Sequence, residues 1–200
     1  PIVTDPREAL ERLAGTADLF LCHDRRIVRR TDDSVLRPAL PVPVALRRSR
    51  GFVPGLVALG RPLDRAVLAV GGDLKSAPAM GRGAAISLSP HVGDLDDPRA
   101  LASFERHVED LLSLYGGEPG AVRYDPHPRY RSGQWALAAP WAPKIAVQHH
   151  HAHILSVMAE HGLEEAIGLS FDGTGFGTDG TVWGGEFLHA SRHGFERLGC

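Results

Sequence analysis

The sequence is poor in cysteine and contains no long apolar run. Its two cysteines, Cys22 and Cys200, lie far apart and form no CxxC pair, which argues against a disulfide framework and a structural zinc finger. No run approaches the ~18 apolar residues of a transmembrane helix, and no charged-then-apolar leader opens the chain. These absences predict a cytoplasmic protein that has no membrane partner.

The chain also lacks a large excess of charge. A formal net charge of −2 argues against wholesale nucleic-acid binding. The 200 residues and 43% hydrophobic content are sufficient for a real core, whereas 23 glycines and 15 prolines predict many turns and close backbone approaches. Because the chain has no initiator Met and stops at Cys200 soon after a strand-like segment, we expect a piece of a longer protein.

Hydrophobic periodicity predicts an α/β fold in which mixed sheets carry flanking helices. The predicted helices cover residues 4–15, 96–117 and 151–162. The predicted strands cover residues 19–23, 25–30, 66–72, 83–90, 121–125, 144–148 and 165–173, with two more inside 174–189. Four prolines between residues 31 and 54 exclude a helix or a central strand there, so this stretch is expected to be extended and to hold the main domain boundary.

The stretch "VQHHHAH", residues 147–153, contains a histidine pair with metal-ligand spacing. His149 and His153 are four residues apart, so on a helix they share a face and can bind one ion. His150 and His151 point elsewhere, which favours supporting or substrate contacts. The alternative is that these histidines are solvated or paired with carbonyl groups. A zinc protease of the HExxH type is not indicated, because residue 150 is not glutamate.

Two glycine-rich stretches are candidates for phosphate or metal binding. In "SFDGTGFGTDGTVWGGEF", residues 170–187, Asp172 ends an apolar strand, a common place for a carboxylate that binds a metal or magnesium phosphate. Backbone N–H groups of such a loop can hold phosphate, although a hairpin with Asp-Gly turns is the alternative. In "VGGDLKS", residues 70–76, Lys75 fits a phosphate contact, and a plain tight turn explains the motif almost as well.

Eight stretches, in this order, resemble the HypF family of hydrogenase-maturation carbamoyltransferases. They are "HDRRIVRRTDDSV", "RRSRGFVP", "LAVGGDLKS", "LSPHVGDL", "YDPHPRY", "VQHHHAH", "AEHGL" and "FDGTGFGTDGTVWGGEFL". The resemblance implies that residues 1–55 are the C-terminal part of a YrdC-like domain with its linker. Residues 56–200 would then be the N-terminal part of a metal-binding carbamoyl-transfer domain with the fold of actin, Hsp70 and sugar kinases (ASKHA).

The resemblance also implies a two-step carbamoyl transfer. Carbamoyl phosphate and ATP would give carbamoyl adenylate in the YrdC-like domain, and the second domain would pass the carbamoyl group to the C-terminal cysteine of a HypE-type partner. Dehydration there yields the cyanide ligand of [NiFe]-hydrogenase. Two alternatives remain: a related carbamoyltransferase that acts on a small-molecule hydroxyl or tRNA, and a non-catalytic metal- or nucleotide-binding module.

Residue by residue, the resemblance makes His149, His153 and Asp172 both the catalytic residues and the ligands of one divalent ion, iron or zinc. The arginines Arg47, Arg48 and Arg50 would contact phosphate or adenylate oxygens. ATP, with Mg, is the other expected cofactor. The expected nucleotide-binding residues are Lys75, Gly173, Thr174, Gly175, Gly177, Asp179, Gly184 and Gly185. Further parts of the family's site would lie beyond Cys200, so this chain alone is expected to be inactive.

Overall fold

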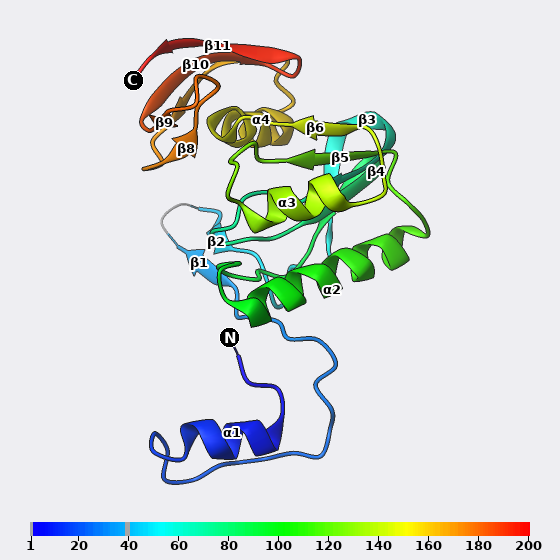
Figure 1. Ribbon diagram of the computed structural model, residues 1–200, viewed down its shortest axis with the longest axis vertical. Helices are drawn as coiled ribbons and strands as arrows, with labels where there is room; N and C mark the ends of the chain where they lie inside the picture. Colours follow the sequence, from blue (N-terminus) through cyan, green and yellow to red (C-terminus); the bar gives the residue numbers. More distant parts are fainter. Residues whose placement is uncertain (1, 39–40) are drawn as a thin grey trace.

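A computed structural model describes residues 2–38 and 41–200 of the chain (Figure 1). Its helices are α1 (Pro6–Leu13), α2 (Pro98–Tyr115), α3 (Arg131–Ala138) and α4 (His149–His161). Its strands are β1 (Val35–Arg37), β2 (Val44–Arg47), β3 (Leu56–Ala69), β4 (Ala79–Leu88), β5 (Ala121–Tyr124), β6 (Lys144–Ala146), β7 (Glu165–Ser170), β8 (Gly175–Phe176), β9 (Val182–Trp183), β10 (Glu186–Ser191) and β11 (Gly194–Gly199). Among the described residues, no helix combines the length and apolar character that a membrane span requires.

The larger sheet is mixed and has the strand order β4-β3-β5-β6. Strands β3 and β4 are antiparallel, whereas β3, β5 and β6 run parallel to one another. Because β5 and β6 are parallel, their carboxyl ends meet at one edge of the sheet, where Tyr124 is paired with Ala146. The residues that follow these two strands, Asp125 and the beginning of α4, are therefore neighbours.

Helix α2 covers one face of this sheet and closes the main core. Asp97 caps its N-terminus by accepting a hydrogen bond from the backbone N–H of Arg99, and Gly116 ends the helix in the left-handed conformation (φ 66°). The buried face of α2, which includes Phe104 and Val108, packs in one cluster with side chains of β3, β4 and β5. Each large apolar side chain buried here contributes about 1.5–3 kcal/mol to the hydrophobic stabilisation.

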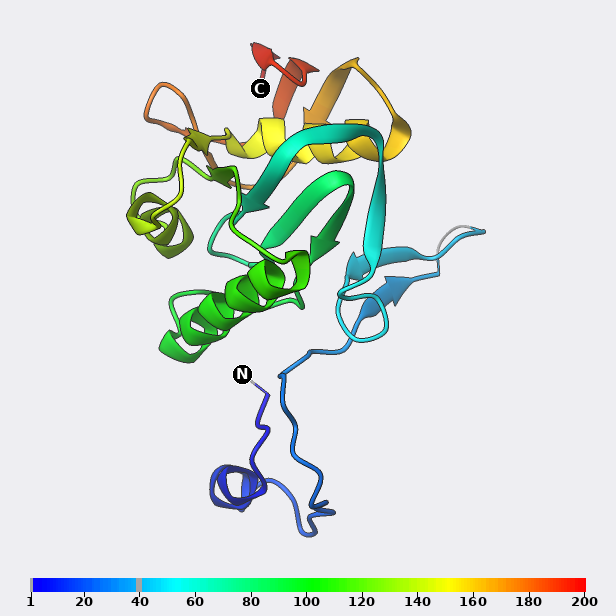
Figure 2. The same cartoon turned by 90° about the vertical axis from the view of Figure 1, so that its right-hand side faces the viewer.

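Helix α4 lies between the larger sheet and a smaller antiparallel sheet of order β11-β10-β7 (Figures 1 and 2). Ile154 and Met158 of α4 pack on Leu188 and Ala190 of β10. The helix approaches β7 so closely that a Cβ at Gly168 would lie 2.5 Å from the side chain of Ile154. The prediction of mixed α/β sheets with flanking helices is confirmed. Helix α4 follows β6 directly and contacts strands of both sheets.

The N-terminal region differs from the prediction. The strands expected over 19–23 and 25–30 do not form, because these residues find no partner strand; Leu19 and Leu21 are 91% and 102% exposed. The stretch 31–54 holds no helix and no central strand among its described residues, as predicted, and its extended segments β1 and β2 pair as an antiparallel hairpin. Residues 39 and 40 of that stretch, and residue 1 of the predicted first domain, lie outside the described residues.

Candidate metal centre

Helix α4 begins with a capped turn that presents the histidines. Gln148 is the N-cap residue, and its side-chain Oε1 accepts a hydrogen bond of 2.9 Å from the backbone N–H of His151. The helix then runs without interruption to Gly162, which ends it with φ 66°. His149 and His153 consequently lie one turn apart on the same face, as their spacing predicts.

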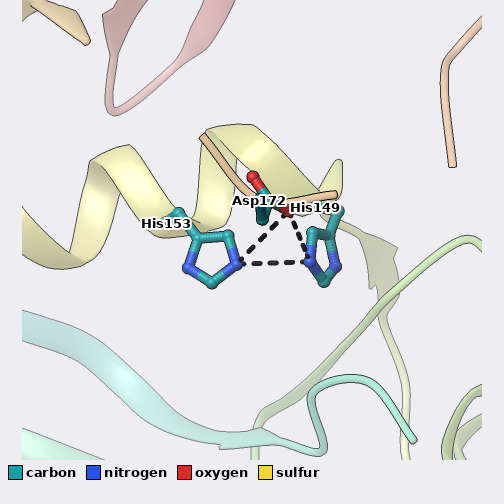
Figure 3. A group of neighbouring side chains, drawn as sticks. All are labelled: His149, His153 and Asp172. Atoms are coloured by element: carbon teal, nitrogen blue, oxygen red, sulfur yellow. Dashed lines mark hydrogen bonds and ion pairs between the residues drawn. The ribbon is translucent and has the colours of Figure 1, made fainter. Parts of the chain in front are cut away.

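Asp172, two residues beyond β7 of the smaller sheet, lies beside these histidines (Figure 3). Its Oδ2 lies 3.1 Å from Nε2 of His149 and 3.8 Å from Nε2 of His153. The two imidazole Nε2 atoms are 3.2 Å apart. The three side chains thus offer two nitrogens and one oxygen that all lie within 4.8 Å of one another.

This donor set fits one small metal ion. Ligand atoms at about 2.0–2.2 Å from a tetrahedral ion are separated by about 3.3–3.6 Å, close to the three separations found here. Oδ2 of Asp172 is also buried and has no hydrogen-bond partner among the described residues. A buried carboxylate oxygen without a partner carries a high free-energy cost, which a bound cation would remove.

His149 is oriented by a second carboxylate that the sequence analysis did not select. Its Nδ1 lies 2.7 Å from Oδ2 of Asp125, which directly follows β5 and is almost completely buried. This hydrogen bond raises the pKa of His149, against the opposing effect of burial. A proton on Nδ1 leaves the lone pair of Nε2 for a metal, which is the usual relation between a carboxylate, a histidine and an ion.

The other two ligands also carry the protonation states that a metal needs. Burial, followed by the neighbouring charge of His149, lowers the pKa of His153 and favours its neutral form. For Asp172, burial acts to raise the pKa, but the hydrogen bond from Ser170 and the nearby histidines outweigh it and hold the pKa below its usual value. Neutral imidazoles and an ionised carboxylate are the metal-binding forms.

The glycine-rich loop packs directly against the histidine helix. A Cβ at Gly175 would lie 2.5 Å from Cε1 of His150, and one at Gly177 would lie 2.2 Å from Nε1 of Trp183. A Cβ at Gly184 would lie 2.7 Å from the carbonyl oxygen of Gly173. These three glycines are therefore required by close packing within the protein, and phosphate contact by the loop stays a prediction.

Asp179 stabilises the glycine-rich loop through hydrogen bonds. Its Oδ1 accepts hydrogen bonds from the backbone N–H and hydroxyl of Thr181 and from Nε1 of Trp183. The contact with Thr181 contributes most to lowering the pKa of Asp179 to about 2. Thr174 is exposed on the same loop.

Trp183 packs against the histidine cluster at His150, and its indole is the wall of that cluster. Its indole stacks on His150 with ring centroids 6.4 Å apart, and the guanidinium of Arg197 lies 4.2 Å from the ring centroid. Arg197 also forms a bidentate pair with the fully buried Glu186, at 2.6 and 2.9 Å. The ion pair therefore fixes the indole, and the indole supports the first turn of α4.

A hollow of about 1110 Å³ opens beside this wall. Gly177 and Asp179 of the glycine-rich loop line it, together with Arg123, Arg192 and His193. The three proposed metal ligands do not contribute to its lining. Its volume slightly exceeds the usual range of about 300–1,000 Å³ for small-molecule sites, and its lining mixes aromatic and cationic side chains.

The three predicted phosphate-binding arginines lie in and just after β2. Arg47 is half-buried and pairs with Asp32 at 3.0 Å, whereas the guanidinium of Arg48 lies 5.2 Å from the ring centroid of Phe52. Arg50 is exposed. Their contacts are within the N-terminal region, and phosphate binding by them stays a prediction.

The "VGGDLKS" turn has a structural function, and phosphate contact by Lys75 stays a prediction. The exposed Lys75 adopts a left-handed conformation with φ 53°. The buried Asp73 accepts hydrogen bonds from the backbone N–H groups of Arg131 and Ser132 and from the hydroxyl of Ser132. Asp73 therefore caps α3, whose own N-cap residue, Tyr130, provides no side-chain cap.

Comparison with known proteins agrees with this geometry. A family model described as "HypF Kae1-like domain" matches residues 62–160, and one described as "Carbamoyltransferase, Kae1-like Domain, second subdomain" matches residues 168–200. Carbamoyltransferase HypF of Synechocystis sp. is 42% identical over 199 residues, which are 98% of this chain and 26% of that protein. A probable carbamoyltransferase HypF of Methanocaldococcus jannaschii is 36% identical over 204 residues, covering 100% of this chain and 27% of its own length.

Solved structures show the same similarity. A crystal structure of full-length HypF in a phosphate- and nucleotide-bound form matches with a TM-score of 0.92 and 44% identity, over 98% of this chain and 31% of that one. HypF of T. kodakarensis matches with a TM-score of 0.89 and 35% identity, over 99% and 26% of the two chains. The fold and the two family models thus define the class as a Kae1-like domain of the carbamoyltransferase type. Within that class, the chain belongs to the HypF family, and it spans about a quarter of the length of the curated relatives.

Asp125 was not selected from sequence, and His150 was expected only to make a supporting or substrate contact. Asp125 carried a usable signal, because it follows the strand next to the one that leads into α4, and such neighbouring strand ends bear ligand sites. No sequence signal indicated where the side chain of His150 lies. Its ring faces the glycine-rich loop, and hydrophobic periodicity does not reveal such a contact between segments about 25 residues apart.

Proposed function

We propose that the protein to which this chain belongs is a carbamoyltransferase of [NiFe]-hydrogenase maturation. It would use carbamoyl phosphate and ATP, through carbamoyl adenylate, to carbamoylate the C-terminal cysteine of a HypE-type protein in the cytoplasm. Family membership supports this proposal, since the named relatives are carbamoyltransferases. The activity is proposed for the whole protein, because the chain spans only about a quarter of those relatives.

The observation that carries the proposal is the convergence of His149, His153 and Asp172 on one point. Two imidazoles and a carboxylate suit either iron or zinc, so we propose one such divalent ion. When bound, it would act as a Lewis acid on the carbamoyl carbonyl or the adenylate oxygens. The chain's own contribution is to favour a neutral His153 and an ionised Asp172, with Asp125 orienting His149.

The nucleotide proposal is supported by the hollow beside the glycine-rich loop. We propose that ATP, with Mg, or carbamoyl adenylate binds there, with Gly177 and Asp179 at its border. We propose two domains, a YrdC-like part over residues 1–55 and a carbamoyl-transfer part over residues 56–200, with phosphate groups passing from the first to the second. The residues proposed to contact these phosphate groups are Lys75, Arg47, Arg48 and Arg50. The other proposed nucleotide-binding residues of the loop are Gly173, Thr174, Gly175, Gly184 and Gly185.

The test separates the two proposed steps in the full-length protein. Carbamoyl-phosphate-dependent exchange between ATP and pyrophosphate measures adenylate formation, and labelled carbamoyl on the HypE-type cysteine measures transfer. We expect His149→Ala and His153→Ala to retain exchange and lose transfer, while His161→Ala, at the exposed end of α4, retains both. Absence of exchange in the wild type would overturn the proposal, and label on RNA or a metabolite would assign a different acceptor.

A further inference from the structure

His150 is fully buried between the first turn of α4, the glycine-rich loop and the indole of Trp183. Its Nδ1 lies 3.0 Å from Nε2 of Gln148, and its Nε2 lies 3.3 Å from Oδ1 of Asp172. Neither the metal-ligand set nor the proposed nucleotide site includes it. A buried polar ring in contact with a proposed ligand calls for a physical explanation.

The tautomer of His150 follows from a chain of unambiguous hydrogen bonds. The backbone N–H of His151 can only donate, so the side-chain atom of Gln148 that it meets at 2.9 Å is the carbonyl oxygen. The remaining amide group of Gln148 is then the NH₂, which also reaches the carbonyl oxygen of Phe176 at 3.3 Å. Because this NH₂ donates to Nδ1 of His150, the proton of the neutral ring is on Nε2.

The proton on Nε2 of His150 faces one oxygen of Asp172. Among the described residues, Nε2 forms no fully aligned hydrogen bond, and Oδ1 at 3.3 Å is the acceptor it faces. The hydroxyl of Ser170 donates to this same Oδ1. Oδ1 is thus bonded to Ser170 and lies 3.3 Å from Nε2 of His150, while Oδ2 is directed at the two ligand imidazoles.

We infer that His150, held in the Nε2–H tautomer by Gln148, is a positioning residue that aims Oδ2 of Asp172 at the metal. This inference rests on the metal site of the proposed function. Supporting hydrogen-bond partners of this kind typically change metal affinity by about 10–100-fold when they are removed.

The decisive variant is Gln148→Glu in the full-length protein, with Zn²⁺ affinity measured by chelator competition. A carboxylate still accepts the hydrogen bond from His151 and keeps the helix cap, but it offers Nδ1 of His150 an acceptor. When the ring is neutral, its proton is then on Nδ1 and the Nε2 lone pair faces Oδ1 of Asp172, so the affinity is measured at alkaline pH, where the ring is neutral. We expect Zn²⁺ affinity to fall about 10–100-fold, which is more than the lower stability of the apo protein explains, because the substitution also removes the hydrogen bond to the carbonyl oxygen of Phe176.

Two substitutions of His150 complete the design. In His150→Gln an amide N–H replaces Nε2–H at a similar reach, so this variant should bind Zn²⁺ more tightly than His150→Leu. His151→Gln is the matched control, because His151 faces Ser191 rather than Asp172 and should leave Zn²⁺ affinity unchanged.

The outcomes separate the inference from the proposed function. A wild-type protein that binds no Zn²⁺ refutes the metal site itself. A wild type that binds Zn²⁺ with the same affinity as Gln148→Glu overturns the positioning role of His150, even if His150→Leu fails to fold. A graded loss, strongest in His150→Leu and Gln148→Glu and weaker in His150→Gln, supports it.

Discussion

Nδ1 of His149 lies 2.7 Å from Oδ2 of Asp125, and the other carboxylate oxygen accepts the backbone N–H of His127 at 2.9 Å. This arrangement fixes the imidazole in the orientation and tautomer in which Nε2 faces Asp172. It also links the carboxyl end of β5 to the first residue of α4, so the larger sheet itself holds a proposed metal ligand in place.

Asp125→Asn is therefore expected to weaken metal binding without removing a ligand. An amide cannot accept from both His149 and His127 with two oxygens, so the imidazole loses its fixed tautomer. We expect about 10–100-fold weaker Zn²⁺ binding by chelator competition. Asp96→Asn, in which the substituted side chain is 82% exposed, is the control, and equal affinities in the two variants would contradict this role.

Loss of a ligand should have a larger effect than loss of its support. In full-length His153→Ala and Asp172→Ala we expect the stoichiometric metal to be absent, because two remaining donors hold an ion poorly. Elemental analysis of aerobically and anaerobically purified protein measures the metal content and identifies the ion as iron or zinc. Unchanged metal content in both variants would show that the ion, if present, lies elsewhere.

Gly175→Ala and Gly173→Ala form a matched pair within the glycine-rich loop. The new methyl at residue 175 would lie 2.5 Å from the ring of His150 and 3.0 Å from Cβ of His149, so the helix and the loop must separate. At residue 173 nothing among the described residues lies within 4 Å of the added Cβ. We expect Gly175→Ala alone to lower both the unfolding temperature and Zn²⁺ affinity; equal effects of the two substitutions would refute the packing explanation.

Asp73→Ala should destabilise α3 locally. The substitution leaves the backbone N–H groups of Arg131 and Ser132 without their carboxylate acceptor, and losing an N-cap costs about 0.5–2 kcal/mol. Hydrogen exchange of residues 131–138 should become faster, with a smaller change in Asp73→Asn because one acceptor oxygen remains. Unaltered exchange in Asp73→Ala would contradict the capping role.

We expect the stability of α2 to depend on pH because of His107, which is buried on this helix. Burial lowers its pKa from 6.5 to about 4, assisted by the arginines Arg29, Arg30 and Arg106 and opposed by Asp110. Between these pH values the unfolded chain binds a proton that the folded chain does not, so stability is complete above pH 6.5 and falls towards pH 4. The loss is at most about 3 kcal/mol.

Hydrogen exchange of α2 measures this effect when wild type and His107→Leu are compared at each pH, since intrinsic exchange rates then cancel. The stability of α2 in the wild type relative to the variant should decrease from pH 6.5 to pH 4. His161→Leu, at the exposed end of α4, is the control and should follow the wild type. A pH-independent difference between wild type and His107→Leu would contradict the prediction.

Local patterns were sufficient for several parts of the fold. The helix from Pro98 was predicted because Asp97 and Pro98 are local capping signals and the apolar period continues to Tyr115. The pairing of His149 with His153 was predictable for the same reason, since i and i+4 on a helix share a face whatever surrounds the helix. The strands expected over 19–23 and 25–30 were wrong because a strand needs a partner, and apolar composition does not supply one.

By itself, the sequence determined a helix over residues 151–162, which α4 extends to His149, the carboxylate that ends the following apolar strand, and the family motifs that contain them. Tertiary structure decided which oxygen of Asp172 faces the histidines, that Asp125 orients His149, and that the glycines of the loop admit the rings of His150 and Trp183. These relations join residues from separate strands and helices. Their geometry depends on how two sheets pack around α4. A local hydrophobic periodicity does not reveal how segments that are distant in the sequence pack together.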